Sequence, residues 1–352
     1  MPDNRTVLMG DDYTNGGLFL FIADKEKDLS AGTLYVAKLG GAGFSLDPAA
    51  AGAPLAWIHL GHATSAEIEA LANSTKPGDI MTVVTTDPLD ATFTKFYVDG
   101  KVNWAKLKPG MEKAAAFLET HRYANLVGAS MGFTKLEGTT VNIKDKVAYS
   151  ALQNVQGSMV RGAASWNAAN NITVEKALVA GCVMAHTLAV GQKDSGGAAM
   201  NSEWVPTLSK TLLVGEDLAT ADATGNLANP DQVANPDNLK FSEKMRTLFI
   251  GEDSSMHVNN MLWAYNVDTK ALTRVATMPV GAESTGLHVA DDLNGWTYIM
   301  SNFQHAGDWI SSLHGKVQAT LDPLVRANYK DRFGAAVGYL TADATGIKMS
   351  KA

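Results

Sequence analysis

Short strand-like segments recur along the whole chain, and they constrain the fold more than any other feature of the sequence. Segments such as "TVLMG", "GLFLFIAD", "GTLYVAKLG", "TLFIG" and "GWTYIMSNF" are rich in β-branched and aromatic residues and border on Gly, Asn or Asp. Some are joined by evident turns, as in "NVDTKALTRVA", where residues 268–270 close a hairpin. The sequence therefore predicts an all-β fold.

Two helical segments and two long polar loops interrupt the strands. Helices are predicted at about 64–74 ("TSAEIEALANS"), where a Thr/Ser start precedes an apolar face, and at about 109–128, between Pro109 and Gly128. The loops cover about 191–206 and 217–238. Loops of this length are uncommon in compact domains unless they are functional or disordered.

A motif of three apolar residues, Gly, an acidic residue and Asp occurs three times, as "VLMGDD", "LLVGED" and "LFIGED". Recurring strand-and-turn units are typical of a β-propeller, so we expect residues 1–352 to form a single propeller-like domain, six-bladed or incomplete. Carboxylates from separate blades could then meet at the central channel, where only a cation would hold them together, and Ca²⁺ suits such oxygen ligands. An acidic pair at a strand end can equally be a turn that caps backbone amides.

The overall composition narrows the classes of partner. A formal net charge of −7, with no basic stripe, argues against nucleic-acid binding. The single cysteine, Cys182, excludes a disulfide within the chain. The first residues do not read as a signal peptide, and no run of about 18 apolar residues predicts a membrane span.

Several segments resemble the PhoX-type alkaline phosphatases and their relatives. The first is "VLMGDD…GLFLFIADKEKDLSAGTLYVAKLGG", and the second is "GASMGFTKLEGTTVNIKDKVAYSAL". Two more, "ANPDNLKFSEKMRTLFIGED" and "VGAESTGLHVADDLNGWTYIMSNFQHAGD", follow in the order of the family. These four segments cover most of the chain outside the inserts.

The resemblance implies a β-propeller that hydrolyses phosphate monoesters at a cluster of Ca²⁺ and Fe³⁺ in its channel. The metal-binding carboxylates would be Asp11, Asp12, Glu137, Glu252, Asp253 and Glu283. The catalytic residues would be Lys135 and Glu137, with Lys135 at the position of a phosphate-binding Arg. Lys keeps the positive charge but lacks the bidentate fork, so its hold on a phosphoryl oxygen should be weaker. For Glu283 and for His305, a structural role is an open alternative.

The sequence also departs from the family pattern. Members of the family carry a "TCEE" stretch, whose Cys binds iron, and an "HE" motif before "GDD", whereas the match here begins at "GDD". The resemblance therefore supports Ca²⁺ more than Fe³⁺. By the same resemblance we expect a periplasmic or secreted protein that acts on a small phosphorylated substrate, while the sequence does not set the oligomeric state.

Three functional hypotheses follow from the sequence. The first is a calcium-dependent phosphoesterase of PhoX type. The second is a propeller that binds metal but is catalytically impaired or inactive, as the missing upstream motifs would favour. The third is a calcium-dependent lactonase or esterase, because a propeller can carry different chemistries.

Overall fold

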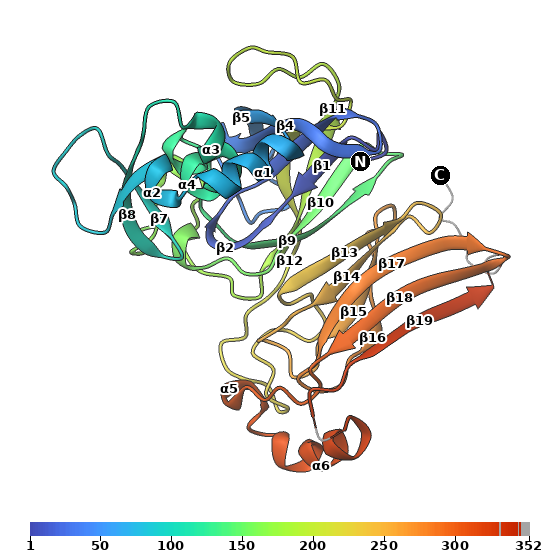
Figure 1. Cartoon of the computed structure of the whole chain (residues 1–352). Helices are drawn as coiled ribbons and strands as arrows, with labels where there is room; N and C mark the ends of the chain where they lie inside the picture. Colours follow the sequence, from blue (N-terminus) through green and yellow to red (C-terminus); the bar gives the residue numbers. More distant parts are fainter. Residues whose placement is uncertain (331, 344, 346–352) are drawn as a thin grey trace. The chain divides into compact units, whose positions relative to one another are not determined.

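The protein is mainly built from β-strands (Figure 1). The computed structural model describes residues 1–330, 332–343 and 345. Strands make up 44% and helices 14% of the chain, which confirms the predicted β-rich class. Among the helices of the described ranges, none combines the length and the apolar character needed to cross a membrane.

The chain divides into two compact units, each assembled from separate stretches of sequence. Unit 1 comprises residues 1–136, 156–177 and 186–210, and unit 2 comprises residues 137–155, 178–185 and 211–352. The chain passes from one unit to the other at five points, and three of these lie within strands: β9 (Phe133–Asn142), β11 (Cys182–Ala189) and β12 (Val205–Val214). The largest sheet has the strand order β1-β3-β4-β5-β12-β11-β10-β9-β2.

Unit 1 carries eight complete strands. They are β1 (Thr6–Met9), β2 (Asp11–Gly16), β3 (Phe19–Lys25), β4 (Asp28–Leu39), β5 (Ala53–Thr64), β6 (Met81–Val84), β7 (Thr94–Val98) and β8 (Lys101–Leu107). β6, β8 and β7 form a separate three-stranded sheet. Phe19, Val36, Phe96 and Met131 belong to the apolar core of this unit.

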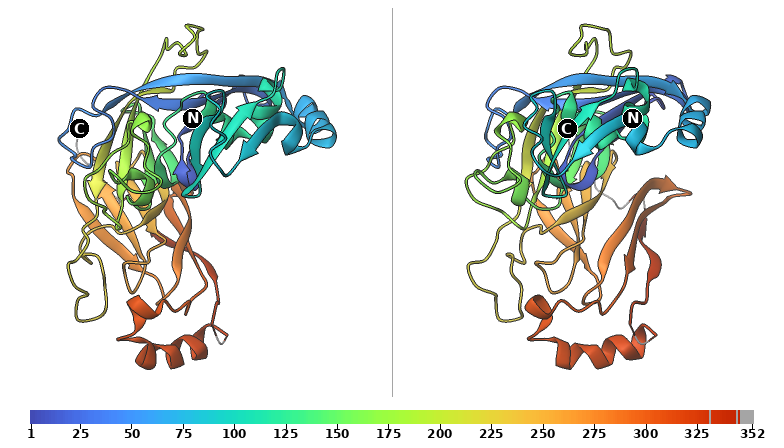
Figure 2. Two further views of the ribbon diagram at one scale, coloured as in Figure 1. Left: turned by 90° about the vertical axis from the view of Figure 1, so that its left-hand side faces the viewer. Right: turned by 60° about the vertical axis from the view of Figure 1, so that its left-hand side comes forward.

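The predicted helical segments of unit 1 are helical in the structure. The helices are α1 (Ser65–Ser74), α2 (Pro77–Ile80), α3 (Glu112–Leu118) and α4 (Thr120–Leu126), followed by the short 3₁₀ turns η1 (Gly157–Met159) and η2 (Ala168–Asn170). Thr64 caps α1, because its side chain accepts a hydrogen bond from the Glu67 N–H while the Glu67 carboxylate accepts one from the Thr64 N–H. The 109–128 segment forms two helices that meet at Glu119. In Figure 2, β5 leads directly into α1.

Unit 2 contains two antiparallel sheets in which successive strands are neighbours. The first has the order β13 (Pro236–Ser242), β14 (Thr247–Glu252), β15 (Met261–Asn266) and β16 (Leu272–Thr277). The second consists of β17 (Glu283–Leu293), β18 (Trp296–Gln304) and β19 (Ala336–Asp343). The unit also holds β10 (Val147–Leu152), α5 (Ser311–His314) and α6 (Gln318–Asn328).

The apolar strand β14 is central to unit 2, and all six of its residues are buried. Leu248 and Ile250 on this strand pack in one core with Phe241 and Trp263 from the strands on either side. Phe249 points to the opposite face and joins a second core with Leu262 and Val280. Because both faces are covered, the polar residues at the end of β14 are held in fixed positions.

Candidate metal centre

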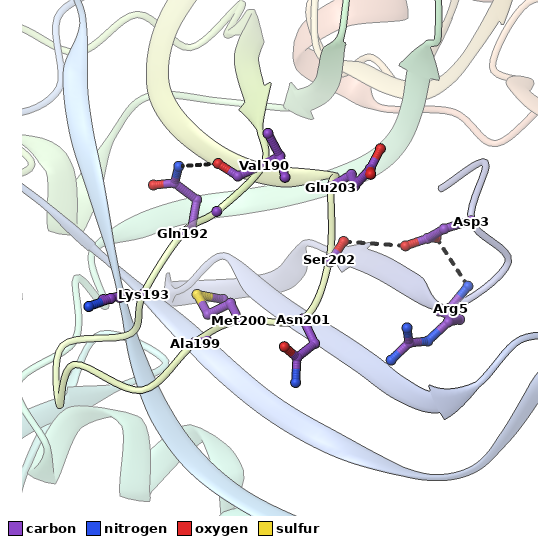
Figure 3. A pocket seen from close by; sticks show the side chains of 11 residues that line it. Asp3, Arg5, Val190, Gln192, Lys193, Ala199, Met200, Asn201, Ser202 and Glu203 are labelled. Carbon is purple, nitrogen blue, oxygen red and sulfur yellow. Dashed lines mark hydrogen bonds between the residues drawn. The ribbon is translucent and has the colours of Figure 1, made fainter.

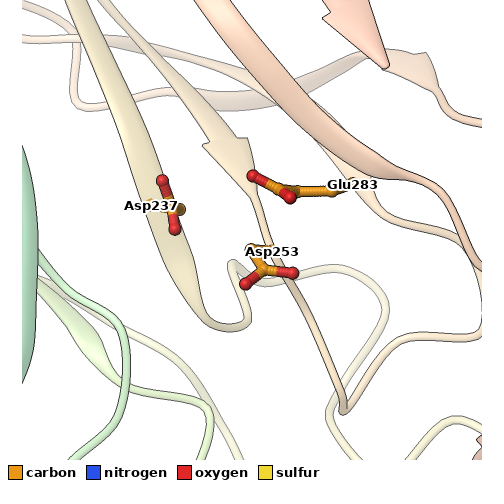
Figure 4. Close-up of side chains that lie close together, drawn as sticks. All are labelled: Asp237, Asp253 and Glu283. Carbon is orange, nitrogen blue, oxygen red and sulfur yellow. The ribbon is translucent and has the colours of Figure 1, made fainter. Parts of the chain in front are cut away.

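Three carboxylates of unit 2 lie close together (Figure 4). One oxygen from each of Asp237, Asp253 and Glu283 lies within 4.8 Å of the others, and all three residues are partly buried. Asp237 is the second residue of β13, Asp253 directly follows β14, and Glu283 is the first residue of β17. The group therefore forms where the ends of three strands meet.

A β-bulge directs Asp237 to this position. Pro236 pairs with Glu252 and Asn238 pairs with Gly251, so Asp237 is an extra residue between two consecutive pairs of the β13–β14 ladder. A bulge of this kind bends the strand and changes the direction of a side chain. The irregularity thus serves to place the carboxylate.

Two glycines allow the strands around the group to approach closely. A Cβ at Gly138, in β9, would lie 2.5 Å from the Asp237 carbonyl oxygen. A Cβ at Gly251, in β14, would lie 2.8 Å from the carbonyl oxygen of Ser284, the residue after Glu283. Since any side chain would push the neighbouring backbone away, glycine at both positions keeps the carboxylates together.

Amide and imidazole groups orient the three carboxylates. Gln153, directly after β10, donates through Nε2 to Asp253 Oδ2 at 3.0 Å and to Asp237 Oδ2 at 3.4 Å. Gln304 Nε2 donates to Glu283 Oε2, and His305 Nε2 lies 3.3 Å from the same oxygen. Such contacts fix the direction in which a carboxylate offers its remaining lone pairs.

The ligand chemistry of the group suits a hard cation. Three carboxylate oxygens at short range repel one another unless a positive charge lies between them. Ca²⁺ binds oxygen at about 2.3–2.6 Å, so oxygens on opposite sides of the ion are roughly 4.6–5.2 Å apart, whereas Mg²⁺ requires roughly 4.0–4.2 Å. Separations of up to 4.8 Å fit either ion, so the spacing does not choose between them and it is the oxygen donor set that favours a hard cation.

Of the six carboxylates expected from the sequence to bind metal, the structure brings Asp253 and Glu283 into this group. Glu252, next to Asp253, has no exposed surface and makes its hydrogen bonds within the protein. Its donors are Ala234 N–H (2.9 Å), Trp263 Nε1 (2.6 Å), Met261 N–H (3.0 Å) and His257 Nδ1 (3.0 Å). Glu252 therefore organises the interior of unit 2.

His257 forms a buried ion pair with Glu252. Its Nδ1 faces the carboxylate, and its Nε2 lies 3.1 Å from the Asn229 carbonyl oxygen. Both partners only accept hydrogen bonds, so both ring nitrogens carry a proton. Burial by itself would lower the pKa of His257, but the hydrogen bond and charge of Glu252 outweigh it and raise the pKa.

The other residues expected at the site have different surroundings. In unit 1, Asp11 lies beside His121, with Oδ2 and Nε2 3.4 Å apart, and Asp12 pairs with Lys135 at 3.3 Å. Glu137 lies in β9 of unit 2, immediately before Gly138, and is not one of the three grouped carboxylates. The roles expected for Lys135 and Glu137 in catalysis stay predictions.

The remaining copy of the acidic motif, "LLVGED", holds the local backbone in place. The Asp217 carboxylate accepts hydrogen bonds from the backbone N–H groups of Val179 and Ala180, both at 2.8 Å. Glu216 accepts from Asn229 Nδ2 at 2.7 Å and from Gln232 Nε2 at 3.2 Å. This acidic pair therefore has the structural role that was the alternative to metal binding, in which a carboxylate caps backbone amides.

Asp237 is the member of the group that sequence reasoning missed. It lies near the end of the segment predicted as a polar loop, 217–238, and no adjacent acid marks it. Its signal was present in "ANPDNLKF", where an Asp precedes an alternating strand that pairs with the "LFIGED" strand. The β-bulge that positions Asp237 could not be predicted from the sequence.

A cavity of about 350 Å³ in unit 1 belongs to a loop junction (Figure 3). Asp3, at its edge, accepts hydrogen bonds from the Arg5 N–H (3.1 Å), the Thr6 N–H (2.9 Å) and Ser202 Oγ (3.3 Å). These bonds tie the first residues of the chain to the loop of residues 190–203. Asp3 therefore has a structural role, which is to hold this loop against the start of the chain.

Comparison of the chain with protein-family models, with curated proteins and with solved structures finds no match. The resemblance to PhoX-type phosphatases thus stays a prediction that depends on the sequence segments quoted above.

Proposed function

We propose that this protein binds Ca²⁺ through Asp237, Asp253 and Glu283 and hydrolyses phosphate monoesters at that centre. The observation that carries the proposal is the convergence of three carboxylate oxygens within 4.8 Å of one another. The phosphoester part rests on the sequence resemblance. Its segment "ANPDNLKFSEKMRTLFIGED" carries the two aspartates, and "VGAESTG" carries Glu283.

Each residue around the centre has a definite task in this proposal. A bound Ca²⁺ would polarise a phosphoryl oxygen and neutralise charge that develops during hydrolysis. Gln153 holds two of the carboxylates in a common orientation through one amide nitrogen. His305 Nε2 lies 3.3 Å from Glu283 Oε2 and helps to hold that carboxylate, and its side chain is one-third exposed.

We also propose that the sheets of unit 2 are related to propeller blades. The support is the four-stranded sheet β13–β16, in which each strand pairs antiparallel with the next one in the chain. Propeller blades are four-stranded sheets of this kind. Two carboxylates of the candidate centre, Asp237 and Asp253, lie at the ends of strands of this sheet, where propellers place their functional residues.

Calcium titration tests the binding step. We expect saturable binding of Ca²⁺ by calorimetry to the whole chain, and a loss of affinity of about tenfold or more in Asp237→Asn and Asp253→Asn, since each removes a charged ligand. Glu216→Gln is the matched control, because it changes the same motif outside the centre. Binding that survives both Asp variants would overturn the site.

Hydrolysis of p-nitrophenyl phosphate tests the reaction. We expect activity that calcium supports, that a chelator removes and that Asp253→Asn reduces by about a hundredfold or more, because transition-state charge is no longer neutralised. Calcium binding with no hydrolysis of this or other phosphate esters would refute the phosphoesterase and leave a metal-binding protein. Hydrolysis of lactones in place of phosphate esters would identify the protein as a calcium-dependent lactonase or esterase.

A further inference from the structure

The outer edge of β19, in unit 2, is long, regular and exposed. β19 forms one margin of the sheet β17-β18-β19, and among the described residues its strand neighbour is β18 (Figure 1). The two strands pair through eight consecutive residues, from Trp296 with Asp343 to Phe303 with Ala336, without a register shift. The far side of β19 therefore presents an uninterrupted row of backbone N–H and C=O groups.

Every other strand at the margin of a sheet in the described part of the chain has a feature that discourages pairing with a second molecule. Such features are a very short strand, a proline, a charged side chain or a β-bulge. β1 and β6 have four residues each, and β7 and β16 carry Lys95 and Arg274. β2, β13 and β17 contain register irregularities, and β13 also begins with Pro236.

β19 has none of these features along its length. It has eight residues, without proline, lysine or arginine, and its one charged residue, Asp343, is the last. The side chains on it are apolar and open to solvent, since Val337 is 82% exposed, Tyr339 60% and Leu340 39%. A regular, apolar and exposed edge of this kind is a template on which a further strand adds through backbone hydrogen bonds.

Both faces of the sheet leave room for an added strand. Val337 and Tyr339 lie on one face, where the Tyr339 ring meets the Tyr298 ring edge to face with their centroids 5.2 Å apart. Leu340 lies on the other face and borders a cavity of about 440 Å³ that Phe303 also lines. The side chains of a strand beside β19 would therefore cover apolar surface on each face.

We propose that β19 pairs antiparallel with β19 of a second copy of this chain and so joins two sheets into one symmetric dimer. The partner strand must itself be exposed, apolar and without a protective feature, and among the marginal strands of the described residues β19 fits this description. Antiparallel pairing about a two-fold axis satisfies both edges with one contact. It also sets the two Asp343 carboxylates at opposite ends, whereas parallel pairing would place like charges side by side.

Sedimentation equilibrium of the whole chain tests the dimer. We expect a monomer–dimer equilibrium with a dissociation constant of roughly 1–100 μM, because a single strand pair buries less surface than a standard interface. Calcium should not be needed, since none of the three grouped carboxylates lies in β19. A chain that is monomeric throughout this range would overturn the proposal, as would dimers that form only after residues 346–352 are removed.

Charge reversal at the centre of β19 tests the contact itself. Tyr339→Lys and Tyr339→Glu each bring two like charges together at the two-fold axis, so each variant alone should dimerise about tenfold or more weakly. An equimolar mixture should associate more tightly than either variant alone, which damage to the fold would not produce. Leu324→Lys, at a 57% exposed position of α6, is the matched control and should dimerise as the unaltered chain does. A mixture without this recovery would overturn the pairing, as would equal weakening by Leu324→Lys.

Thiol cross-linking tests the orientation of the two strands. The natural Cys182 is buried, so a cysteine introduced on β19 supplies the exposed thiol. In an antiparallel pair the two copies of Leu340→Cys lie near the axis, whereas those of Asp343→Cys lie roughly 20 Å or more apart. We expect a short bismaleimide to join the first pair and not the second. Equal cross-linking of both would overturn the antiparallel arrangement.

Discussion

The strand ends "VLMGDD" in unit 1 and "LFIGED" in unit 2 share a sequence pattern but differ in what their acids do. In unit 1, Asp11 faces a cavity next to His121, and Asp12 forms an exposed pair with Lys135. In unit 2, Glu252 is buried among four protein donors, and Asp253 joins the group of carboxylates.

The difference lies in what surrounds each strand end. The pattern places a glycine and two acidic residues at the end of a strand, but it does not determine which groups their carboxylates contact. Which partners each carboxylate meets is decided by other strands and helices, such as α4 in unit 1 and β15 and β17 in unit 2. The same local motif therefore supports a cavity wall, a buried ion pair or a candidate metal centre.

The largest effect should come from Glu252. Glu252→Gln leaves the His257 imidazolium without its counter-ion and disturbs four buried hydrogen bonds, so we expect the free energy of unfolding to fall by about 3 kcal/mol or more. Urea denaturation measures this loss. Asp11→Asn, the equivalent change in the unit 1 motif, should cost much less, and equal losses would remove the contrast between the two strand ends.

Calcium should stabilise the protein through Asp253. At a Ca²⁺ concentration about 100 times the dissociation constant, we expect a gain of about 2.7 kcal/mol in the free energy of unfolding. Asp253→Asn should lose this gain but show unchanged or slightly higher stability without calcium, because one of three repelling charges is gone. Thermal unfolding with and without calcium checks this, and Asp12→Asn should keep the full gain.

Gly138 should matter for both stability and calcium. Gly138→Ala places a methyl group 2.5 Å from the Asp237 carbonyl oxygen, and we expect a cost of about 1–3 kcal/mol together with weaker calcium binding. Gly78→Ala is the control, since its Cβ would meet nothing within 4 Å. Calcium affinity unaffected by Gly138→Ala would show that the close approach of β9 is not needed for the centre.

The two histidine–carboxylate pairs should respond oppositely to pH. The raised pKa of His257 means that its contribution to stability is fully present below about pH 6.5 and is lost as the pH rises through the folded-state pKa. The lowered pKa of His121 means that stability is lost as the pH falls below about 6.5. NMR titration of the two imidazoles measures both, and shifts of the same sign would contradict the distinction.

The β-rich class of the fold and the positions of several strands could be predicted from the sequence, because alternating and apolar segments directly reflect burial. The strands around "TVLMG", "TLFIG" and "GWTYIMSNF" are present, and the helical segments begin near the predicted capping residues. The pairing of strands that are distant in sequence, such as β2 with β9, could not be predicted. It depends on contacts between residues more than a hundred positions apart.

The candidate centre was only partly predictable, for a different physical reason. Asp253 could be found because it lies in the acidic motif that ends a strand, and Glu283 because it lies in a segment that resembles the PhoX-type phosphatases. Glu252 looked equivalent to Asp253, yet neighbouring residues in a strand point to opposite faces, and its face is the buried one. Asp237 depended on a bulge, which arises from the mismatch between two strands and not from either strand alone.

That mismatch has a consequence for how such a centre could arise or disappear. Between Pro236 and Asn238, β13 has one residue more than the facing part of β14. Loss of a single codon would restore an even ladder and remove one carboxylate, while the apolar residues on both faces of β14 kept their neighbours. The capacity to hold a cation is thus set by chain length at one point, and related chains could gain or lose it without any change in their cores.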